Sequence, residues 1–82
     1  MKYEIEIKKR AEKELSLIPR AQAKKVVDAI IAMEDGLKGD VKRLTHFTPE
    51  YRLRVGDWRV LFEMVGRRIV IYRILNRKEA YR

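Results

Sequence analysis

Apolar and polar residues alternate along residues 51–62 in a pattern that predicts a β-hairpin. The alternation from Tyr51 to Val55 has the two-residue period of a strand. The Gly-Asp pair at residues 56–57 suits a two-residue turn, because glycine adopts positive φ without steric cost. The resulting register pairs Val55 with Trp58, Arg54 with Arg59, Leu53 with Val60 and Tyr51 with Phe62. One face of the hairpin is then apolar and the other is basic.

Other segments also carry the spacing of regular elements. Residues 3–7 alternate like a half-buried strand, and apolar residues then follow helical spacing along residues 11–18. Pro19 breaks that pattern and can open a second helix at its first turn, and Gly36 is expected to end that helix. Residues 68–74 are rich in β-branched side chains, which predicts a strand covered on both faces and internal to the sheet.

The order of these elements predicts an α+β fold of the type β-α-α-β-β-β. The two N-terminal helices are expected to pack on one face of an antiparallel sheet, over the apolar side of the hairpin. The first strand must join the sheet, since alone it would leave its backbone groups without partners. Gly39 and Asp40 are expected to form a turn, and residues 41–50 show no clear period. At 82 residues, the chain is expected to be one domain, residues 1–82.

Composition excludes several classes of protein. The chain has no cysteine, so it has no disulfide framework and no thiolate nucleophile. It has no long apolar run, and its N-terminus does not resemble a signal peptide. We therefore expect a cytoplasmic protein with no membrane partner.

The net charge of +8 is unevenly distributed along the chain. Residues 51–82 carry nine Lys/Arg and three Asp/Glu, whereas residues 1–50 carry eleven and nine. A basic excess in the half that holds the predicted hairpin favours nucleic acid or an acidic protein as partner. The alternative, a charge that serves solubility alone, stays open.

Three arginines on the polar face of the hairpin form the candidate site: Arg52, Arg54 and Arg59. Guanidinium groups are forked, permanently charged donors that match phosphate oxygens. Like charges directly opposite on a sheet destabilise it, so such a cluster is expected to have a use, and the natural use is to hold phosphate. The alternative, a solvated charged face with the arginines open to solvent and no ligand, remains.

The C-terminal residues are expected to extend this site. Arg77, Lys78 and Arg82 can reach the same face, and Tyr81 lies among them. A tyrosine beside basic groups can stack on a base or orient a hydroxyl. The predicted site therefore joins a strand hairpin with a polar tail.

No metal site and no cofactor are expected. His46 is the only histidine, has no partner at a suitable spacing, and is predicted to be a loop residue. Asp28, Glu34 and Asp35 lie on or near the second predicted helix, where solvation is their expected role. Trp58 is expected to pack in the core rather than stack on a base.

Two stretches of the chain resemble a known family. They are the hairpin, residues 51–60, and the ending Asn-Arg-Lys-Glu-Ala-Tyr-Arg, residues 76–82. With these motifs the chain resembles the RelE/ParE superfamily, toxins of bacterial and archaeal toxin–antitoxin pairs, over nearly its whole length. The resemblance implies the fold described above and places the chain closest to the RelE branch.

That branch comprises messenger-RNA endonucleases that act in the ribosomal A site and so inhibit translation. The reaction implied is metal-free attack of an RNA 2′-OH on the adjacent phosphate. The catalytic residues implied are Arg52 and Arg54 at the two basic strand positions, Arg59 for phosphate binding, Arg77 for the leaving group or transition state, and Tyr81 near the attacking hydroxyl. The RNA-binding residues expected are Arg52, Arg54, Arg59, Lys78 and Arg82.

The chain departs from the family pattern at several positions. Many relatives carry Gly-His before the tail arginine, where this chain has Leu75-Asn76, so a histidine general acid is absent there. Some relatives have lysine where this chain has Arg52 and Arg54, and arginine is a poor general base because it is not deprotonated in proteins. Electrostatic catalysis is therefore expected.

The resemblance also implies partners: a cognate antitoxin in a hetero-oligomer, the ribosome with its mRNA, and operator DNA reached indirectly through the antitoxin. Two alternatives remain open. One is a ParE-like inhibitor of DNA gyrase that shares the fold and cuts no RNA. The other is a degenerate, non-toxic module that only binds an antitoxin.

Overall fold

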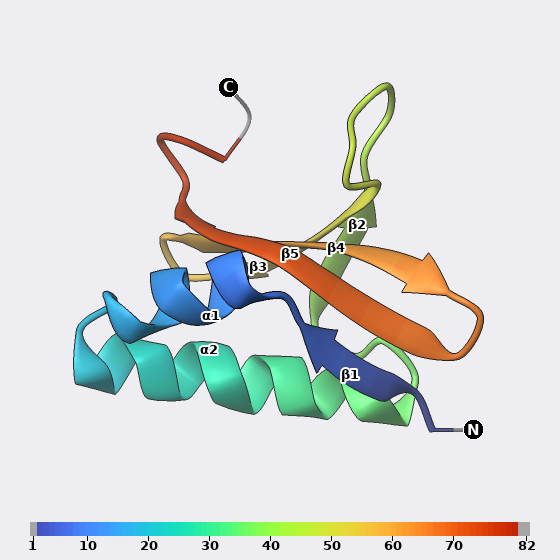
Figure 1. Cartoon of the computed structure of the whole chain (residues 1–82), viewed down its shortest axis with the longest axis horizontal. Helices are drawn as coiled ribbons and strands as arrows, with labels where there is room; N and C mark the ends of the chain where they lie inside the picture. The colour runs from blue at the N-terminus through green and yellow to red at the C-terminus, as the bar shows by residue number, and fades with distance from the viewer. Residues whose placement is uncertain (1, 81–82) are drawn as a thin grey trace.

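A computed structural model describes residues 2–80 as a layer of two helices under one face of a five-stranded sheet (Figure 1). The elements are β1 (Glu4–Ile7), α1 (Lys9–Ser16), α2 (Arg20–Ala32), the 3₁₀ turn η1 (Met33–Asp35), β2 (Asp40–Arg43), β3 (Tyr51–Val55), β4 (Trp58–Val65) and β5 (Arg68–Asn76). The α+β architecture with both helices on one face confirms the predicted fold class.

The sheet has the strand order β1-β5-β4-β3-β2. Strand β5 lies between β1 and β4, which confirms that it is internal, and β1 does join the sheet. Two details differ from the prediction: β2 is an additional edge strand antiparallel to β3, and β1 pairs with β5 in parallel. No hairpin links β1 to β5, so the sequence pattern held no information about their relative direction.

The central hairpin has the predicted register. Its paired residues are Tyr51 and Phe62, Leu53 and Val60, Arg54 and Arg59, and Val55 and Trp58. The turn uses Gly56 at φ +60°, the left-handed conformation that glycine adopts without strain. Between Leu61 and Phe62, the pairing of β4 with β5 shifts by one residue, and the sequence pattern did not predict this irregularity.

The hydrophobic core lies between the sheet and the helices. Leu53, Val60 and Phe62 from the hairpin are at most 1% exposed, and Val26 and Ile30 of α2 are buried with them. The rings of Tyr51 and Phe62 stack with centroids 5.4 Å apart. Trp58 packs at the edge of this core, as predicted, and its Nε1 donates to Gln22 Oε1 of α2 at 2.7 Å.

The start of α2 and the end of the helical segment lie at the proline and glycine from which they were predicted. Pro19 stands immediately before α2, and its carbonyl accepts from the N–H groups of Gln22 and Ala23. Gly36 takes φ +108° and ends the helical segment after η1. No helix within residues 2–80 is long and apolar enough to cross a membrane.

Two segments rise from the sheet on the side away from the helices (Figure 1). One is the loop between β2 and β3, residues 44–50, and the other is the C-terminal segment that follows β5. Leu61, Val70 and Ala80 are buried as well, but lie outside the core under the helices. Apolar side chains are therefore also buried outside the core that the helices cover.

Candidate functional site

A cavity of about 370 Å³ opens beside the basic side of the hairpin. Its lining consists of Lys42, Leu44, Arg52, Arg54 and Arg59. The arginines alternate with the buried residues Leu53 and Val60, so they point away from the helices. Tertiary structure thus brings the three predicted arginines to one cavity, which we call the arginine site, and adds Lys42 from a strand that the pattern had not revealed.

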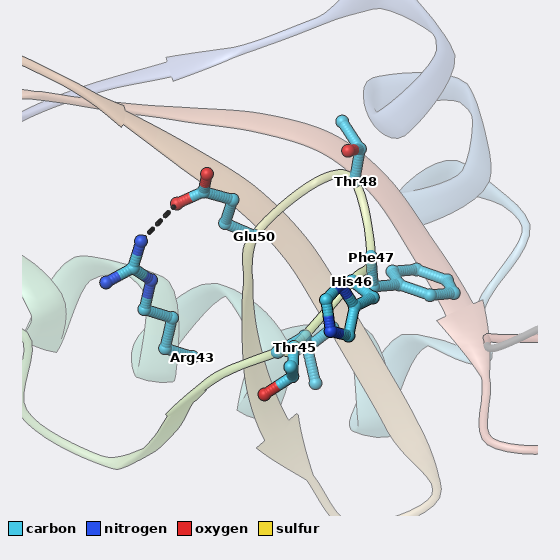
Figure 2. A pocket seen from close by; sticks show the side chains of 7 residues that line it. Arg43, Thr45, His46, Phe47, Thr48 and Glu50 are labelled. Carbon is cyan, nitrogen blue, oxygen red and sulfur yellow. Dashed lines mark ion pairs between the residues drawn. The ribbon is translucent and has the colours of Figure 1, made fainter.

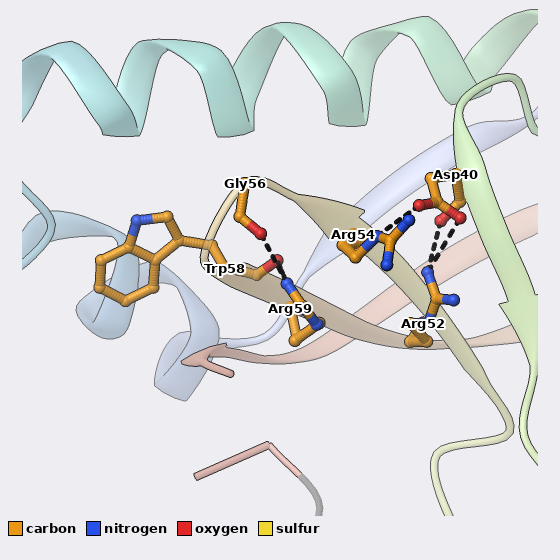
Figure 3. Close-up of polar contacts among 6 residues, drawn as sticks. All are labelled: Asp40, Arg52, Arg54, Gly56, Trp58 and Arg59. Atoms are coloured by element: carbon orange, nitrogen blue, oxygen red, sulfur yellow. Dashed lines mark hydrogen bonds and ion pairs between the residues drawn. The ribbon is translucent and has the colours of Figure 1, made fainter. Parts of the chain in front are cut away.

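Arg54 and Arg59 are direct cross-strand partners, which is an unfavourable position for two like charges. Arg59 is held at the turn, where its Nη1 donates to the carbonyl of Gly56 at 2.8 Å and to that of Trp58 at 3.0 Å (Figure 3). These hydrogen bonds hold the Arg59 guanidinium against the backbone of the hairpin. They leave its charge uncompensated by any acidic group among residues 2–80.

Asp40 compensates the other two arginines. Arg52 Nη1 donates to the Asp40 carbonyl at 2.9 Å and to its Oδ1 at 3.1 Å, while Arg54 Nε donates to Oδ2 at 2.5 Å (Figure 3). Hydrogen bonding from Arg52 and then from Arg54 holds the pKa of the Asp40 carboxyl below its ordinary value, although partial desolvation acts against the shift.

Asp40 had been predicted as a turn residue, and that prediction was wrong. It is the first residue of β2 and the register partner of Arg54. The alternative of a charged face open to solvent is also contradicted at Arg52, whose side chain is only 12% exposed. Both differences have one cause, because β2 lies along β3 and covers the edge of the hairpin.

Arg77 begins the C-terminal segment beside the hairpin turn. Its backbone N–H donates to the Asp57 carbonyl at 2.8 Å, and its Nε lies 3.7 Å from Asp57 Oδ1. The N–H of Lys78 donates to Asn76 Oδ1 at 3.1 Å, so the side chain of Asn76 stabilises a turn at the start of this segment. Tyr81 and Arg82 lie outside the described residues.

A second cavity, of about 280 Å³, lies between the two raised segments. Leu61, Arg73 and Leu75 line it from the sheet. The remaining lining residues are Phe47, Thr48 and Pro49 from the loop, with Glu79 and Ala80 from the C-terminal segment. Leu75 is the register partner of Arg59, so this cavity continues the surface of the arginine site.

The loop between β2 and β3 encloses a further hollow of about 450 Å³ (Figure 2). Arg43 and Glu50 close its base with an ion pair of 3.4 Å. His46 is an exposed loop residue, as predicted, at φ +56°. The acidic side chain that lines this hollow with His46 is that of Glu50, and it is paired with Arg43.

A family model described as the ParE toxin of the type II toxin–antitoxin system parDE matches residues 5–81. The chain belongs to the RelE/ParE superfamily of toxins. The candidate toxin RelE1 of Methanocaldococcus jannaschii is 35% identical to this toxin, over 96% of this chain and 93% of its own length. Toxin RelE3 of the same organism is 40% identical over 55% of this chain and 51% of its own length.

Solved structures of toxin–antitoxin complexes have the same fold as this toxin. A chain of the RelB–RelE complex from Methanococcus jannaschii is 28% identical and covers 89% of this chain and 91% of its own, with a TM-score of 0.75. A chain of the archaeal RelE–RelB complex from Pyrococcus horikoshii is 27% identical with a TM-score of 0.78, over 98% of this chain and 100% of its own. The resemblance seen in the hairpin and the tail is therefore confirmed at the level of the superfamily.

Proposed function

We propose that this toxin is a ribosome-dependent messenger-RNA endonuclease that inhibits translation. The observation that carries the proposal is the single cavity that joins Arg52, Arg54 and Arg59 with Lys42. Clustered cations are what binding to a nucleic-acid backbone needs. A toxin that acted only by binding a protein would have no need for such a cluster, and the 35% identical relative carries a RelE name.

In the proposed reaction, the 2′-OH of one nucleotide attacks the adjacent phosphate. The bond from phosphorus to the 5′-oxygen of the next nucleotide breaks, which leaves a 2′,3′-cyclic phosphate and a free 5′-OH. The transition state carries extra negative charge on the phosphoryl oxygens, and guanidinium groups that are already in place stabilise it. Arg59 suits this role because two backbone carbonyls hold its Nη1.

The other members of the site have separate roles. Arg52 and Arg54 bind and orient the phosphate, since arginine does not act as a general base in proteins. Arg77, which follows β5 and contacts the turn of the hairpin, stabilises the leaving oxygen. Tyr81, together with ribosomal RNA groups, positions the attacking hydroxyl, and Lys78 and Arg82 add cations along the RNA backbone. The mechanism therefore rests on electrostatics and orientation, with no metal or cofactor.

A cognate antitoxin is the proposed protein partner. Two relatives that are 27% and 28% identical to this chain were solved as complexes of RelE with RelB. An acidic segment of the antitoxin laid over the arginine site would silence the toxin, and the pair would bind operator DNA through the antitoxin. We place the action of the free toxin in the cytoplasm, where its ribosomal substrate lies.

Primer extension on a defined messenger RNA in a translation extract tests the nuclease proposal. We expect wild-type toxin to produce discrete cuts at A-site positions, and no cuts when ribosomes are removed. Arg59→Ala is expected to reduce cutting about 100-fold, the usual effect of losing a donor to a transition-state oxyanion. Tyr81→Phe is expected to reduce it as well.

Arg20→Ala is the matched control, because Arg20 is an exposed arginine at the start of α2 with no ion pair among residues 2–80. Its cutting should equal that of the wild type. A folded wild-type toxin that cuts no ribosome-bound RNA would refute the proposal.

Inhibition of DNA gyrase is the second candidate function, and one observation favours it: the matching family model is that of ParE toxins. A supercoiling assay separates the two, since a gyrase inhibitor blocks supercoiling and leaves messenger RNA intact. A degenerate module would do neither and would not slow growth when its synthesis is induced without the antitoxin.

A further inference from the structure

We propose that Asp40 is a positioning residue of the arginine site, whose carboxylate aims the guanidinium groups of Arg52 and Arg54 at the scissile phosphate. This inference rests on the proposed nuclease function. It predicts that Asp40 raises turnover while weakening the binding of RNA, because one carboxylate both orders the cations and repels the phosphate.

The placement of Asp40 follows from the register of β2 on β3. Asp40 pairs with Arg54, and Lys42, two residues further along, pairs with Arg52. Side chains two residues apart on a strand share a face, so Asp40 and Lys42 lie on the face that carries the arginines. Its carboxylate therefore enters the cluster from the neighbouring strand, between two cations that belong to β3.

Asp40 immobilises the two arginines to different degrees. Both its carbonyl and its Oδ1 accept from Nη1 of Arg52, whose side chain is 12% exposed. Its Oδ2 accepts only from Nε of Arg54, whose side chain is 54% exposed. Among residues 2–80, Nη1 and Nη2 of Arg54 donate to no protein acceptor.

Asp40 therefore fixes the Arg54 guanidinium through Nε and, among the described residues, leaves Nη1 and Nη2 free to bind a ligand in the cavity. Arginine side chains have many rotamers, and an arginine beside Arg59 on the opposite strand would otherwise swing away from the like charge. A donor fixed before the reaction stabilises a transition state at no cost of reorganisation. Asp40 thus holds the arginines of the cluster in place against their mutual repulsion.

The same carboxylate opposes the approach of RNA. It places a negative charge within hydrogen-bond distance of the cations that would bind phosphate. A residue that only neutralised repulsion would affect folding and leave turnover unchanged. A residue that positions the arginines and also repels phosphate raises kcat without lowering KM, and this combination makes the inference testable.

The decisive comparison is Asp40→Asn against wild type, with kcat and KM measured for cleavage of ribosome-bound messenger RNA. We expect kcat to fall about 10-fold, because a small misplacement of groups that position the substrate can lower the rate by up to about 100-fold. KM should stay unchanged or fall. Asp40→Glu, which keeps the charge, should restore part of kcat, and Asp35→Asn, an exposed acidic residue beyond α2, should change neither constant.

An unchanged kcat in folded Asp40→Asn would overturn the inference, and so would a raised KM. Thermal melting of each variant establishes that it is folded. A second measurement does not depend on cleavage. The arginine Nε–H signals are recorded in ¹⁵N NMR spectra of the toxin, with and without inorganic phosphate. We expect the Arg54 signal to be slow to exchange with water in wild type and fast in Asp40→Asn, with phosphate binding no weaker.

The two measurements separate the inference from the proposed function. If wild-type toxin cuts no RNA, the nuclease proposal fails, and the NMR signals still report whether Asp40 orders Arg54. If wild type cuts RNA and the Arg54 signal is the same in both proteins, the nuclease proposal stands and the positioning role is refuted.

Discussion

The backbone N–H of Arg77 donates to the carbonyl of Asp57 at 2.8 Å, which ties the start of the C-terminal segment to the turn of the central hairpin. The two residues are 20 positions apart in the sequence, yet this bond extends the ladder in which Asn76 pairs with Trp58. The arginine that follows the last strand is therefore held beside the turn of the hairpin by a backbone contact, and its side chain is left 61% exposed.

Removal of the Arg77 side chain tests its assignment to the leaving group. Arg77→Ala should lower cleavage of ribosome-bound RNA about 100-fold, as expected for loss of one donor to developing negative charge. It should change the free energy of unfolding by less than about 1 kcal/mol, because an exposed ion pair contributes little. Cleavage rates and urea denaturation check the two statements, with Arg20→Ala as the control, and wild-type cleavage in Arg77→Ala would remove Arg77 from the mechanism.

Glu14 of α1 anchors the helix layer to β5. Its carboxylate accepts from Arg73 Nε, from Arg73 Nη2 at 2.8 Å and from the N–H of Ile74 at 2.9 Å, and its side chain is only 18% exposed. Glu14→Ala leaves these donors without a partner and should cost about 2–3 kcal/mol of unfolding free energy. Urea denaturation followed by the fluorescence of Trp58, the single tryptophan, measures this.

Glu12→Ala is the control for that experiment, since Glu12 lies on the same helix and is exposed. Its effect should stay within about 0.5 kcal/mol. Equal effects of the two substitutions would mean that the contacts of Glu14 contribute no net stability.

Gly39 controls the entry into β2. It has φ +111°, and a Cβ atom there would lie 3.0 Å from Leu53 Cδ1. Gly56 has φ +60° with open space around it. Gly56→Ala should cost about 1 kcal/mol for the left-handed backbone alone, whereas Gly39→Ala should cost about 2 kcal/mol or more because Leu53 must also move. Thermal or urea denaturation of both variants provides the comparison, and the reverse order would contradict this account of the β2 entry.

Acid should weaken the fold through two carboxylates. Hydrogen bonding from Arg52 lowers the pKa of Asp40, and hydrogen bonding from Lys8 lowers the pKa of Glu6. The unfolded chain then binds protons more readily than the folded one, so the stabilisation is present above the ordinary carboxyl range and is lost as pH falls below about 4. Melting temperatures recorded from about pH 6 to about pH 2 should fall, and less steeply in Asp40→Asn. Parallel curves would show that Asp40 makes no contribution.

The hairpin illustrates what local sequence can determine. Strict alternation from Tyr51 to Val55 and the turn at Gly56 specify both the register and the face of every side chain, because a slip of one residue would expose the apolar set. The same logic predicted the convergence of Arg52, Arg54 and Arg59, and their common cavity bears this out geometrically. Their catalytic roles stay a prediction.

Contacts between distant segments required the tertiary structure. Strand β2 has only four residues, with one half-buried position at Val41, so its period is too short to distinguish from a loop. Its pairing with β3 places Asp40 against Arg52 and Arg54, and the parallel pairing of β1 with β5 likewise joins residues more than 60 positions apart. By itself, the sequence determined the elements, the hairpin register and the cluster of arginines, since these depend on neighbours along the chain. Only the packed sheet decided which acidic group faces that cluster, because a pairing between remote strands leaves no periodic trace in either of them.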